Sequence, residues 1–216
     1  MPSAPCPNSQ RIDFFSKTAP YYDFALDLLT FGHYAEFQKR AIEVLAPRPG
    51  EKILDLCSGT GRVASWIAQA IGDEGEIVGM DITETMVKVA KERYGGLKNL
   101  IFVQRDVTKP FGHENYFDGI FTSYAIHELP ESKRQRVFEN SYLALKDRGR
   151  IVIADFNPHV TRRGKTILLL FFKLFERGNL NFFSFDQTEM LERAGFNKIK
   201  SFPVLAGLFQ ITLAHK

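Results

Sequence analysis

Short apolar runs alternate with amphipathic stretches along the middle of the chain. The apolar runs predict five strands: Lys52–Leu56, Glu76–Met80, Leu100–Gln104, Phe117–Ser123 and Arg150–Asp155. Apolar residues at helical spacing predict three helices between them: Gly61–Ile71, Glu84–Tyr94 and Ser132–Leu145. Strands and helices that alternate at this spacing form right-handed crossover connections, so we expect a mainly parallel sheet.

The pattern changes near the end of the chain. A short helix is predicted over Asp186–Ala194, followed by two strands, Lys198–Leu205 and Phe209–Ala214. Only a few residues around Gly207 join these strands, and so short a connection requires an antiparallel hairpin. The sequence therefore predicts an α/β protein with a seven-stranded, mostly parallel sheet. We expect helices on both faces of this sheet and an antiparallel C-terminal hairpin.

The N-terminal part has a helical pattern. Apolar residues group at helical spacing from Ile12 to about Ala46, and Pro47 and Gly50 then end the pattern. Residues 1–11 are rich in Pro, Ser and Asn, which predicts a disordered start. We therefore expect a single domain over residues 12–216, in which 12–46 form a helical cap.

An apolar insertion, 157–185, follows the fifth predicted strand. Its second part carries ten large apolar residues: Leu168, Leu169, Leu170, Phe171, Phe172, Leu174, Phe175, Phe182, Phe183 and Phe185. The interpretation that we prefer is a lid that covers an apolar binding pocket together with the helical cap. Two alternatives stay open. One is ordinary core packing, and the other is an interfacial helix at an anionic membrane, with positive charge from Arg162, Arg163 and Lys165.

Composition narrows the class of protein. Apolar residues make up 44% of the 216 positions and charged residues 25%, which is enough to bury the core of one α/β domain. The net charge is only +3 and the basic residues are scattered, so we do not expect nucleic acid as a partner. Cys6 and Cys57 lie far apart without metal-ligand spacing, so neither a disulfide framework nor a metal site is expected.

Targeting and membrane signals point to a location. Met1–Pro5 does not contain a charged region followed by an apolar run, so no signal peptide is expected. The most apolar stretch, Ile167–Phe175, is too short to span a bilayer. We therefore expect a cytoplasmic protein, and the apolar insertion leaves peripheral membrane contact open.

The strongest chemical signal is the run from Asp55 to Gly61, Asp-Leu-Cys-Ser-Gly-Thr-Gly. Its glycines let the backbone bend sharply between strand and helix, and they let a ligand approach without a Cβ in the way. The free N–H groups at the start of the next helix favour a negatively charged group. Asp81 ends the following strand, where a carboxylate can accept hydrogen bonds from both hydroxyls of a ribose. This order of elements predicts a nucleoside-cofactor site, and the alternative is a tight bend with a surface acid.

The residues around the bend separate two kinds of cofactor. Nicotinamide-binding folds use G-x-G-x-x-G, in which the second glycine makes room for a pyrophosphate. Here the helix continues as Arg62-Val63-Ala64, and Asp55 precedes the bend. A carboxylate on the first strand can bind the ammonium of an amino-acid moiety, which favours S-adenosylmethionine over a dinucleotide.

These motifs resemble those of class I S-adenosylmethionine-dependent methyltransferases, which have a Rossmann-like methyltransferase fold. Leu54–Gly61 looks like their first motif, and Asp81 matches their ribose-binding acid. Arg105-Asp106-Val107 looks like their adenine-contacting stretch, and Tyr116–Asp118 with Ser123-Tyr124 resembles their fourth-strand motif. The terminal hairpin matches the extra antiparallel strand that distinguishes this fold from dehydrogenases. The cofactor-binding residues that the resemblance implies are Asp55, Cys57, Gly59, Thr60, Gly61, Asp81, Ile82, Met86, Asp106, Val107 and Ser123.

The N-terminal part resembles the ubiquinone and menaquinone methyltransferase branch of this class. Phe14-Phe15-Ser16 through Pro20-Tyr21-Tyr22-Asp23 carries this resemblance, together with Pro49–Lys52 before the first strand. Two positions depart from the branch. Cys57 stands where the commonest residue is the first glycine of the motif, and His127-Glu128 stand where Arg and Asn are expected. The second departure bears on the acceptor and leaves the assignment of the cofactor unchanged.

Methyl transfer from a sulfonium needs alignment and exclusion of water, and a base helps where the acceptor carries a proton. His127 is the predicted base, because it follows the fourth strand at the carboxyl edge and histidine exchanges protons near neutral pH. A histidine that only forms local hydrogen bonds is the alternative. Tyr22 is the residue that we expect to wall the methyl site. Tyr21 and Tyr124 are alternatives, and a core role stays open for all three.

Three acids near strand ends receive separate interpretations. Asp55 is expected to bind the ammonium of the cofactor, and the alternative is an acid that caps the bend. Asp118 is interpreted as structural. Asp155 is expected at the edge of the pocket.

The sequence thus favours one function and leaves others open. The leading hypothesis is methyl transfer from S-adenosylmethionine, with release of S-adenosylhomocysteine, to a small, apolar or lipid-like acceptor such as a quinone-ring carbon. The alternatives are N- or O-methylation of another small molecule or lipid headgroup, a nicotinamide oxidoreductase, and a non-catalytic subunit that binds S-adenosylmethionine. Arsenite methylation is disfavoured, because it needs clustered thiols and the chain has two isolated ones. The acceptor atom and the oligomeric state stay undetermined at this level.

Overall fold

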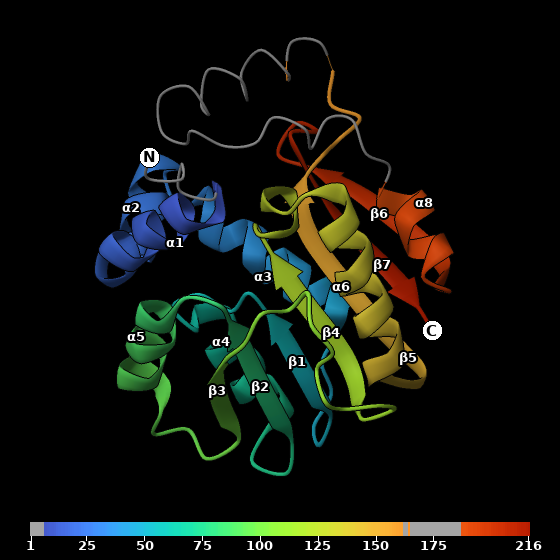
Figure 1. The fold of residues 1–216 in the computed structure, drawn as a ribbon, viewed down its shortest axis with the longest axis horizontal. Helices are drawn as coiled ribbons and strands as arrows, with labels where there is room; N and C mark the ends of the chain where they lie inside the picture. Colours follow the sequence, from blue (N-terminus) through green and yellow to red (C-terminus); the bar gives the residue numbers. More distant parts are fainter. Residues whose placement is uncertain (1–6, 162–163, 165–186) are drawn as a thin grey trace, which may run out of the picture.

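A seven-stranded sheet forms the centre of the computed structural model, which describes residues 7–161, 164 and 187–216 (Figure 1). The strands are β1 (Lys52–Leu56), β2 (Glu76–Asp81), β3 (Leu100–Gln104), β4 (Phe117–Ser123), β5 (Leu145–Phe156), β6 (Asn197–Val204) and β7 (Phe209–His215). Their order across the sheet is β3-β2-β1-β4-β5-β7-β6. Strands β1 to β5 are parallel, and β7 runs antiparallel to both β5 and β6. The predicted α/β fold with an antiparallel C-terminal hairpin is confirmed.

Helices lie on both faces of this sheet, as predicted (Figure 1). The described helices are α1 (Pro7–Thr18), η1 (Ala19–Tyr21), α2 (Tyr22–Leu29), α3 (His33–Leu45), α4 (Arg62–Ile71), α5 (Glu84–Tyr94), η2 (Ile126–Glu128), α6 (Glu131–Ala144) and α8 (Gln187–Arg193). Helices α3, α4 and α5 supply buried residues to the core on one face, and α6 and α8 supply the core on the other. The sheet is therefore the middle layer of three.

Neighbouring positions of the buried strands supply the two cores. Ile53 and Val152 belong to the core beneath α3 and α4, whereas Leu54 and Ile151 belong to the core beneath α6 and α8. Successive side chains of a strand point to opposite faces, which explains why these strands are apolar at nearly every position. Because both faces are covered, the row of carboxyl strand ends is the edge where a ligand site is expected.

The strand β5 differs most from the prediction. It begins at Leu145 instead of Arg150. The register with β4 shifts between Phe117 and Gly119, and Arg148 has a φ of +65°. The Asp-Arg-Gly stretch at 147–149, which lies between the predicted helix and the predicted strand, is therefore an irregularity inside the strand. The other strands begin and end within one residue of the prediction.

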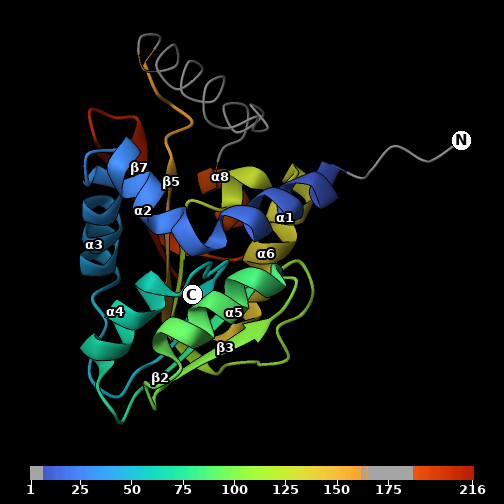
Figure 2. The ribbon, with the colours of Figure 1, turned by 90° about the vertical axis from the view of Figure 1, so that its left-hand side faces the viewer.

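The helices α1, η1 and α2 form an N-terminal cap that lies above α5 (Figure 2). The helix α1 begins at Pro7, so residues 7–11, which composition assigned to a disordered start, are helical. Proline fits the first helical turn, because the N–H that it lacks has no partner there in any case. Residues 1–6 lie outside the described residues. The helix α3 was predicted within the cap, but it packs against β5 and belongs to an outer layer of the sheet.

The predicted apolar insertion, 157–185, lies mostly outside the described residues, which include only 157–161 and 164 of it. The start of this segment is tied to the β6–β7 hairpin, because Asn157 donates hydrogen bonds to the carbonyl oxygens of Leu208 and Gly207 (both 2.9 Å). The lid, core and membrane interpretations of 166–185 stay predictions. None of the described helices combines the length and apolar character needed to cross a bilayer.

Candidate functional site

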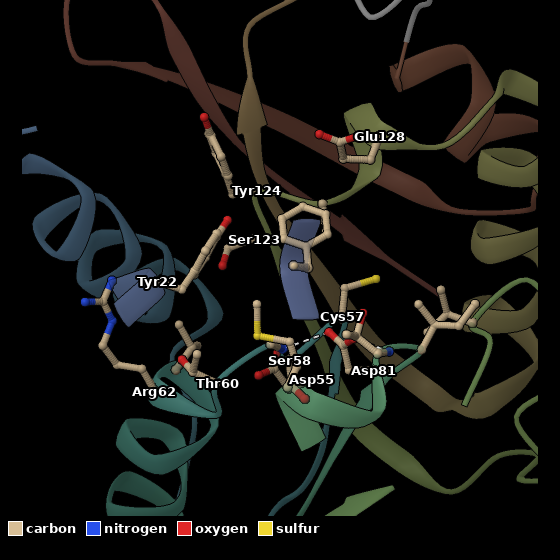
Figure 3. Close-up of a pocket in the computed structure, with 18 of the residues that line it drawn as sticks. Tyr22, Asp55, Cys57, Ser58, Thr60, Arg62, Asp81, Ser123, Tyr124 and Glu128 are labelled. Carbon is tan, nitrogen blue, oxygen red and sulfur yellow. Dashed lines mark hydrogen bonds between the residues drawn. The ribbon is translucent and has the colours of Figure 1, made fainter. Parts of the chain in front are cut away.

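A cavity of about 170 Å³ lies at the carboxyl ends of β1, β2 and β4, beneath the N-terminal cap (Figure 3). Its walls come from the bend after β1, the end of β2, the cap and the turn η2 after β4. The strand order reverses between β1 and β4, since β2 and β3 lie on one side and β5 on the other. Open α/β sheets bind their ligands at such a switch point.

The bend between β1 and α4 is left-handed at three positions. The φ angles are +57° at Cys57, +53° at Gly59 and +82° at Gly61. A Cβ at Gly61 would lie 2.5 Å from Cζ of Phe102, so packing and backbone conformation both require glycine there. A Cβ at Gly59 would meet nothing within 4 Å, because Gly59 faces the cavity. The φ at Cys57 gives a physical reason why glycine is the usual residue at this position of the resembling motif.

Asp81 joins the bend to the end of β2. Its Oδ2 accepts a hydrogen bond from the N–H of Gly59 (2.9 Å), and its Oδ1 accepts one from the N–H of Thr83 (2.8 Å). Burial raises the pKa of Asp81 above its usual value, although the hydrogen bonds from Thr83 and Gly59 oppose this shift. Each carboxylate oxygen has a further lone pair, so Asp81 can also accept hydrogen bonds from a ligand.

Asp55 is the second carboxylate of the cavity, and its surroundings differ. It is buried on β1, and its Oδ2 has no hydrogen-bond partner among the residues that the structure describes. Burial, and next the charge of Asp81, raise the pKa of Asp55 well above its usual value. A cation beside Asp55 would supply a partner and offset the repulsion. Burial also raises the pKa of the Cys57 thiol well above its usual value, so this thiol is not an activated nucleophile.

These features fit the cofactor predicted from the sequence. S-adenosylmethionine carries an ammonium that suits the orphaned oxygen of Asp55 and ribose hydroxyls that suit Asp81. The open space at Gly59 lets a ligand lie against the backbone. Beyond β3, Asp106 lines the cavity, and its Oδ1 is held by the N–H and the hydroxyl of Thr108 (2.9 and 2.7 Å).

The N-terminal cap is fastened to the bend through Asp23. Its Oδ2 accepts hydrogen bonds from Oγ1 of Thr60 (2.6 Å) and from Nη1 of Arg93 on α5 (2.8 Å). Arg93 also donates to the carbonyl oxygen of Pro20 (2.7 Å). The hydroxyl of Thr60 therefore binds the cap, and α2 is held over the cavity by contacts to both the bend and α5.

A second polar chain runs from the cap to β4. Arg62 donates to Asp27 (2.6 Å) and to Oε1 of Gln38 (2.7 Å). The amide nitrogen of Gln38 donates to Oγ of Ser123 (3.2 Å). Ser123 is thus positioned from α3, and both Gln38 and Arg62 line the cavity.

The remaining wall is the turn η2 with the residue before it, and here one prediction has to be corrected. His127 is only 2% exposed and does not line the cavity. Its Nδ1 lies 2.6 Å from Oδ1 of Asp155, and its backbone N–H donates to Oδ2 of the same residue (3.0 Å). Asp155 thus holds the imidazole behind the wall, and His127, the predicted base, does not reach the cavity in this structure. Tyr124, Ala125, Glu128 and Leu129 line the cavity on this side, and Figure 3 shows Tyr124 and Glu128.

The structure brings most of the predicted residues together. All the predicted cofactor-binding residues except Gly61 line the cavity, and Tyr22 does too. Gly61 supports the bend from below, where its N–H donates to the carbonyl oxygen of Ser58 (2.9 Å). Asp155 was expected at the pocket edge and instead contacts His127. Asp118 accepts hydrogen bonds from Lys52 and Lys146 at the opposite edge of the sheet, as expected for a structural residue.

Sequence reasoning missed several lining residues. Asp23 could have been found, because it closes the Pro20–Asp23 motif. Gln38 and Lys133 carry no local signal, since they reach the cavity only through the packing of α3 and α6. Glu128 was noted only as a departure from a family pattern, because the direction of a side chain in a short turn cannot be read from the sequence.

Comparison with known proteins adds an independent line of evidence. The sequence profile of the ubiE/COQ5 methyltransferase family matches residues 7–183 of the chain. The ubiquinone/menaquinone biosynthesis C-methyltransferase of Photorhabdus laumondii is 30% identical over 148 residues, which cover 67% of this chain and 58% of that relative. A homologous enzyme of Edwardsiella ictaluri is 29% identical over 146 residues, covering 66% and 57%. The chain thus spans less than two thirds of the length of these relatives.

Solved structures show the same fold. A SAM dependent methyltransferase from Aquifex aeolicus aligns with a TM-score of 0.64 at 21% identity, covering 82% of this chain and 88% of that one. Phosphoethanolamine N-methyltransferase 2 of Haemonchus contortus, in complex with S-adenosyl-L-methionine, aligns with a TM-score of 0.62 at 17% identity, covering 83% and 52%. At such identities the likeness shows the fold and does not indicate an acceptor.

Proposed function

The chain belongs to the ubiE/COQ5 methyltransferase family of S-adenosylmethionine-dependent enzymes, and on this premise we propose that it transfers a methyl group to a small, apolar acceptor. A ring carbon of a quinone is the acceptor atom that we favour, since the relatives are named ubiquinone/menaquinone biosynthesis C-methyltransferases. One observation carries the proposal. The buried carboxylates Asp55 and Asp81, on the neighbouring strands β1 and β2, meet at one cavity.

Each part of the cavity has a task in this reaction. The ionised carboxylate of Asp55 holds the ammonium of the cofactor, and Asp81 accepts hydrogen bonds from the ribose. When bound, S-adenosylmethionine supplies a methyl group on positively charged sulfur, an electrophile that needs no covalent help from the protein. Tyr22 from the cap and Tyr124 after β4 exclude water from the acceptor side. Alignment of this kind is worth roughly 7–11 kcal/mol of the barrier.

The apolar wall supports a flat, ring-like acceptor. Phe15, Tyr22 and Leu129 line the cavity, and Tyr124 packs its ring against Tyr34 at a centroid distance of 5.5 Å. Rigid aromatic walls suit ring-shaped ligands, because aromatic pairs gain from edge and offset contacts.

One observation favours a second candidate, methylation of an amine. The carboxylate of Glu128 lies on the acceptor side of the cavity, where it would attract a cationic amine (Figure 3). The same carboxylate would also accept a hydrogen bond from a phenolic hydroxyl, so the acceptor panel has to include both classes.

Two measurements test the proposed function. Calorimetry should give micromolar or tighter binding of S-adenosylhomocysteine and no competition from NADH; preferential binding of NADH would contradict the proposal. Turnover is then measured by mass spectrometry with short-chain hydroquinones that lack one ring methyl group, with phenols and with amines. We expect the hydroquinones to be methylated on carbon. Methylation of amines alone would replace our acceptor by the second candidate. Binding without turnover of any acceptor would favour a non-catalytic subunit.

We also propose that the N-terminal cap contacts a membrane surface, from which a lipid-like acceptor could be drawn. Four large apolar side chains of the cap and the loop after it support this: Tyr21, Phe24, Leu28 and Phe31 are 71%, 70%, 64% and 91% exposed. Exposed apolar groups of this kind favour a lipid interface. Vesicles of anionic phospholipid should sediment the wild type but not a Phe24→Ser/Phe31→Ser variant. Leu143→Ser on α6, which alters another exposed apolar residue, is the matched control and should sediment like the wild type. Equal sedimentation of the two variants would contradict the contact between the cap and the membrane.

A further inference from the structure

Three ionisable side chains form a continuous chain from the strand β5 to the cavity. Asp155 at the end of β5 is 5% exposed and lies 2.6 Å from Nδ1 of His127. Nε2 on the other side of the imidazole lies 3.2 Å from Oε1 of Glu128. Asp155 and His127 are sealed from the cavity, whereas Glu128 lines it. Figure 3 shows Glu128 on the side of the pocket away from Asp55 and Asp81.

His127 lies between two carboxylates. Its Nδ1 is at hydrogen-bond distance from Oδ1 of Asp155, and its Nε2 is at ion-pair distance from Oε1 of Glu128. A positive charge on the imidazole would therefore face a carboxylate on each side. It would stabilise the ionised form of Glu128 at the cavity wall.

We propose that Glu128 is the catalytic residue that takes a proton from the methyl acceptor, and that His127 and Asp155 are positioning residues for its carboxylate. This inference rests on the proposed function and names the acceptor class more closely: a ring that carries a hydroxyl beside the carbon to be methylated. Such a ring places its O–H against Glu128, and the remaining ring surface meets the apolar wall.

The balance of the reaction requires one proton acceptor. When a methyl group from a sulfonium replaces a ring hydrogen, the positive charge on sulfur disappears and one proton is released. In the proposed step the acceptor's O–H bond breaks, its proton passes to a carboxylate oxygen of Glu128, and the electron pair stays on the acceptor. The electron-rich ring carbon then forms the bond to the methyl group. The hydrogen of that carbon moves to the ring oxygen, which restores the hydroxyl, and Glu128 later returns its proton to solvent.

The charges and hydrogen bonds around His127 favour the ionised form of Asp155. Burial tends to raise the pKa of Asp155, but the charge of His127 and hydrogen bonds from His127 and Phe156 outweigh it and hold this pKa below its usual value. From α6, Arg134 donates to the carbonyl oxygens of Ile126 and His127 (3.0 and 2.8 Å), which fixes the turn. Burial lowers the pKa of Arg134 to about 10, so it remains a cation at neutral pH.

The test uses Glu128→Gln in the full chain, with Glu131→Gln, an exposed glutamate at the start of α6, as the matched control. S-adenosylhomocysteine affinity should stay within about threefold of wild type in both. With the hydroquinone probe, kcat of Glu128→Gln should fall by roughly 10²–10⁴-fold, the usual contribution of a general base. Formate should restore part of the turnover of Glu128→Ala, which a purely structural role would not allow.

A binding measurement separates this proposal from the proposed function. The complex with S-adenosylhomocysteine is titrated with 1-naphthol and with 1-methoxynaphthalene. The wild type should prefer naphthol by about ten- to a hundredfold, as expected for a hydrogen bond to a charged group, and Glu128→Gln should lose this preference. If no acceptor is turned over, the proposed function fails while this comparison still reports on Glu128.

Several outcomes would overturn the assignment. Turnover by Glu128→Gln within threefold of wild type would contradict the proposed role, and so would a wild-type preference of this variant for naphthol. For the positioning residues, His127→Gln should lower kcat by at least about tenfold with little change in KM or in S-adenosylhomocysteine affinity. A wild-type kcat of the His127→Gln variant would contradict the positioning role of His127 and Asp155.

Discussion

The backbone N–H of Gly59 donates a hydrogen bond of 2.9 Å to Oδ2 of Asp81, which ties the bend after β1 to the end of β2. The carboxylate that shapes the bend is thus the one expected to hold the ribose. Asp81→Asn offers only one oxygen for two backbone donors, so one N–H loses its acceptor. We expect the free energy of unfolding to fall by about 1–3 kcal/mol and the affinity for S-adenosylhomocysteine to fall at least about tenfold. Chemical denaturation and calorimetry measure these effects, with the exposed Asp147→Asn as control.

Asp55→Asn should separate stability from binding. The variant removes a buried charge whose Oδ2 has no hydrogen-bond partner among the described residues. We therefore expect the ligand-free protein to gain about 1 kcal/mol, or about 2–4 °C in Tm. It should also lose at least about tenfold in affinity for S-adenosylhomocysteine, because the ammonium loses its counter-charge. A variant that is less stable and binds normally would contradict both the repulsion and the role in binding.

The raised pKa of Asp55 also predicts a pH dependence. The folded protein holds a proton on Asp55 at pH values where the unfolded chain has released it. The contribution of this group to stability therefore falls as pH rises from about 4 through the raised pKa. Binding of an ammonium needs the ionised form, so affinity for S-adenosylhomocysteine should weaken as pH falls through the same range. Calorimetry against pH checks this, and Asp55→Asn should flatten that part of the dependence.

The two glycines of the bend should respond differently to alanine. Gly59→Ala places its methyl group in open space, so the variant should fold with a loss of about 1–2 kcal/mol from its left-handed φ. Its affinity for S-adenosylhomocysteine should fall strongly, because the methyl group occupies the ligand's side of the bend. Gly61→Ala adds the clash with Phe102 and should be the less stable of the two. Equal stability losses with unchanged binding by Gly59→Ala would show that the ligand does not lie against this bend.

The ion pair between Asp23 and Arg93 should govern exchange of the ligand more than stability. The Arg93 side chain is 34% exposed, so the pair should contribute less than about 1 kcal/mol to unfolding. Arg93→Ala also removes the hydrogen bond to Pro20, which loosens α2 over the cavity. We expect dissociation of S-adenosylhomocysteine to become several-fold faster in stopped-flow measurements. Arg136→Ala on the exposed side of α6 is the control, and equal dissociation rates would contradict a gating role of the cap.

The elements that depend on neighbouring residues in the sequence could be predicted. The strand β1 and the bend after it could be located because an apolar run, an acid and two glycines stand in one short stretch. The antiparallel hairpin followed from the short connection around Gly207. The position of β5 was less accessible, because a register shift opposite Phe117 depends on the neighbouring strand.

The walls of the site could be predicted only in part. The motif residues that follow the strands β1 and β2 line the cavity as expected, because the end of a strand fixes the direction of the side chains there. The acceptor side depends on a short turn, in which neighbouring residues differ sharply in direction. His127 was therefore expected at the cavity, and Glu128 was noted only as a departure from the family pattern. In the structure the buried Asp155 holds the imidazole inward, and the Glu128 carboxylate faces the cavity.

The fastening of the N-terminal cap has a consequence for how the molecule matures. Asp23 is separated by 37 positions from Thr60 and by 70 from Arg93, so the cap can dock only after the bend and α5 have formed. Contacts between such distant positions form slowly in folding, and the partly exposed pair Asp23–Arg93 opens more readily than the buried strands. When the cap opens in the folded protein, the sheet should stay intact while the cavity is exposed to solvent. A ligand that contacts both the bend and the cap would then favour the closed form.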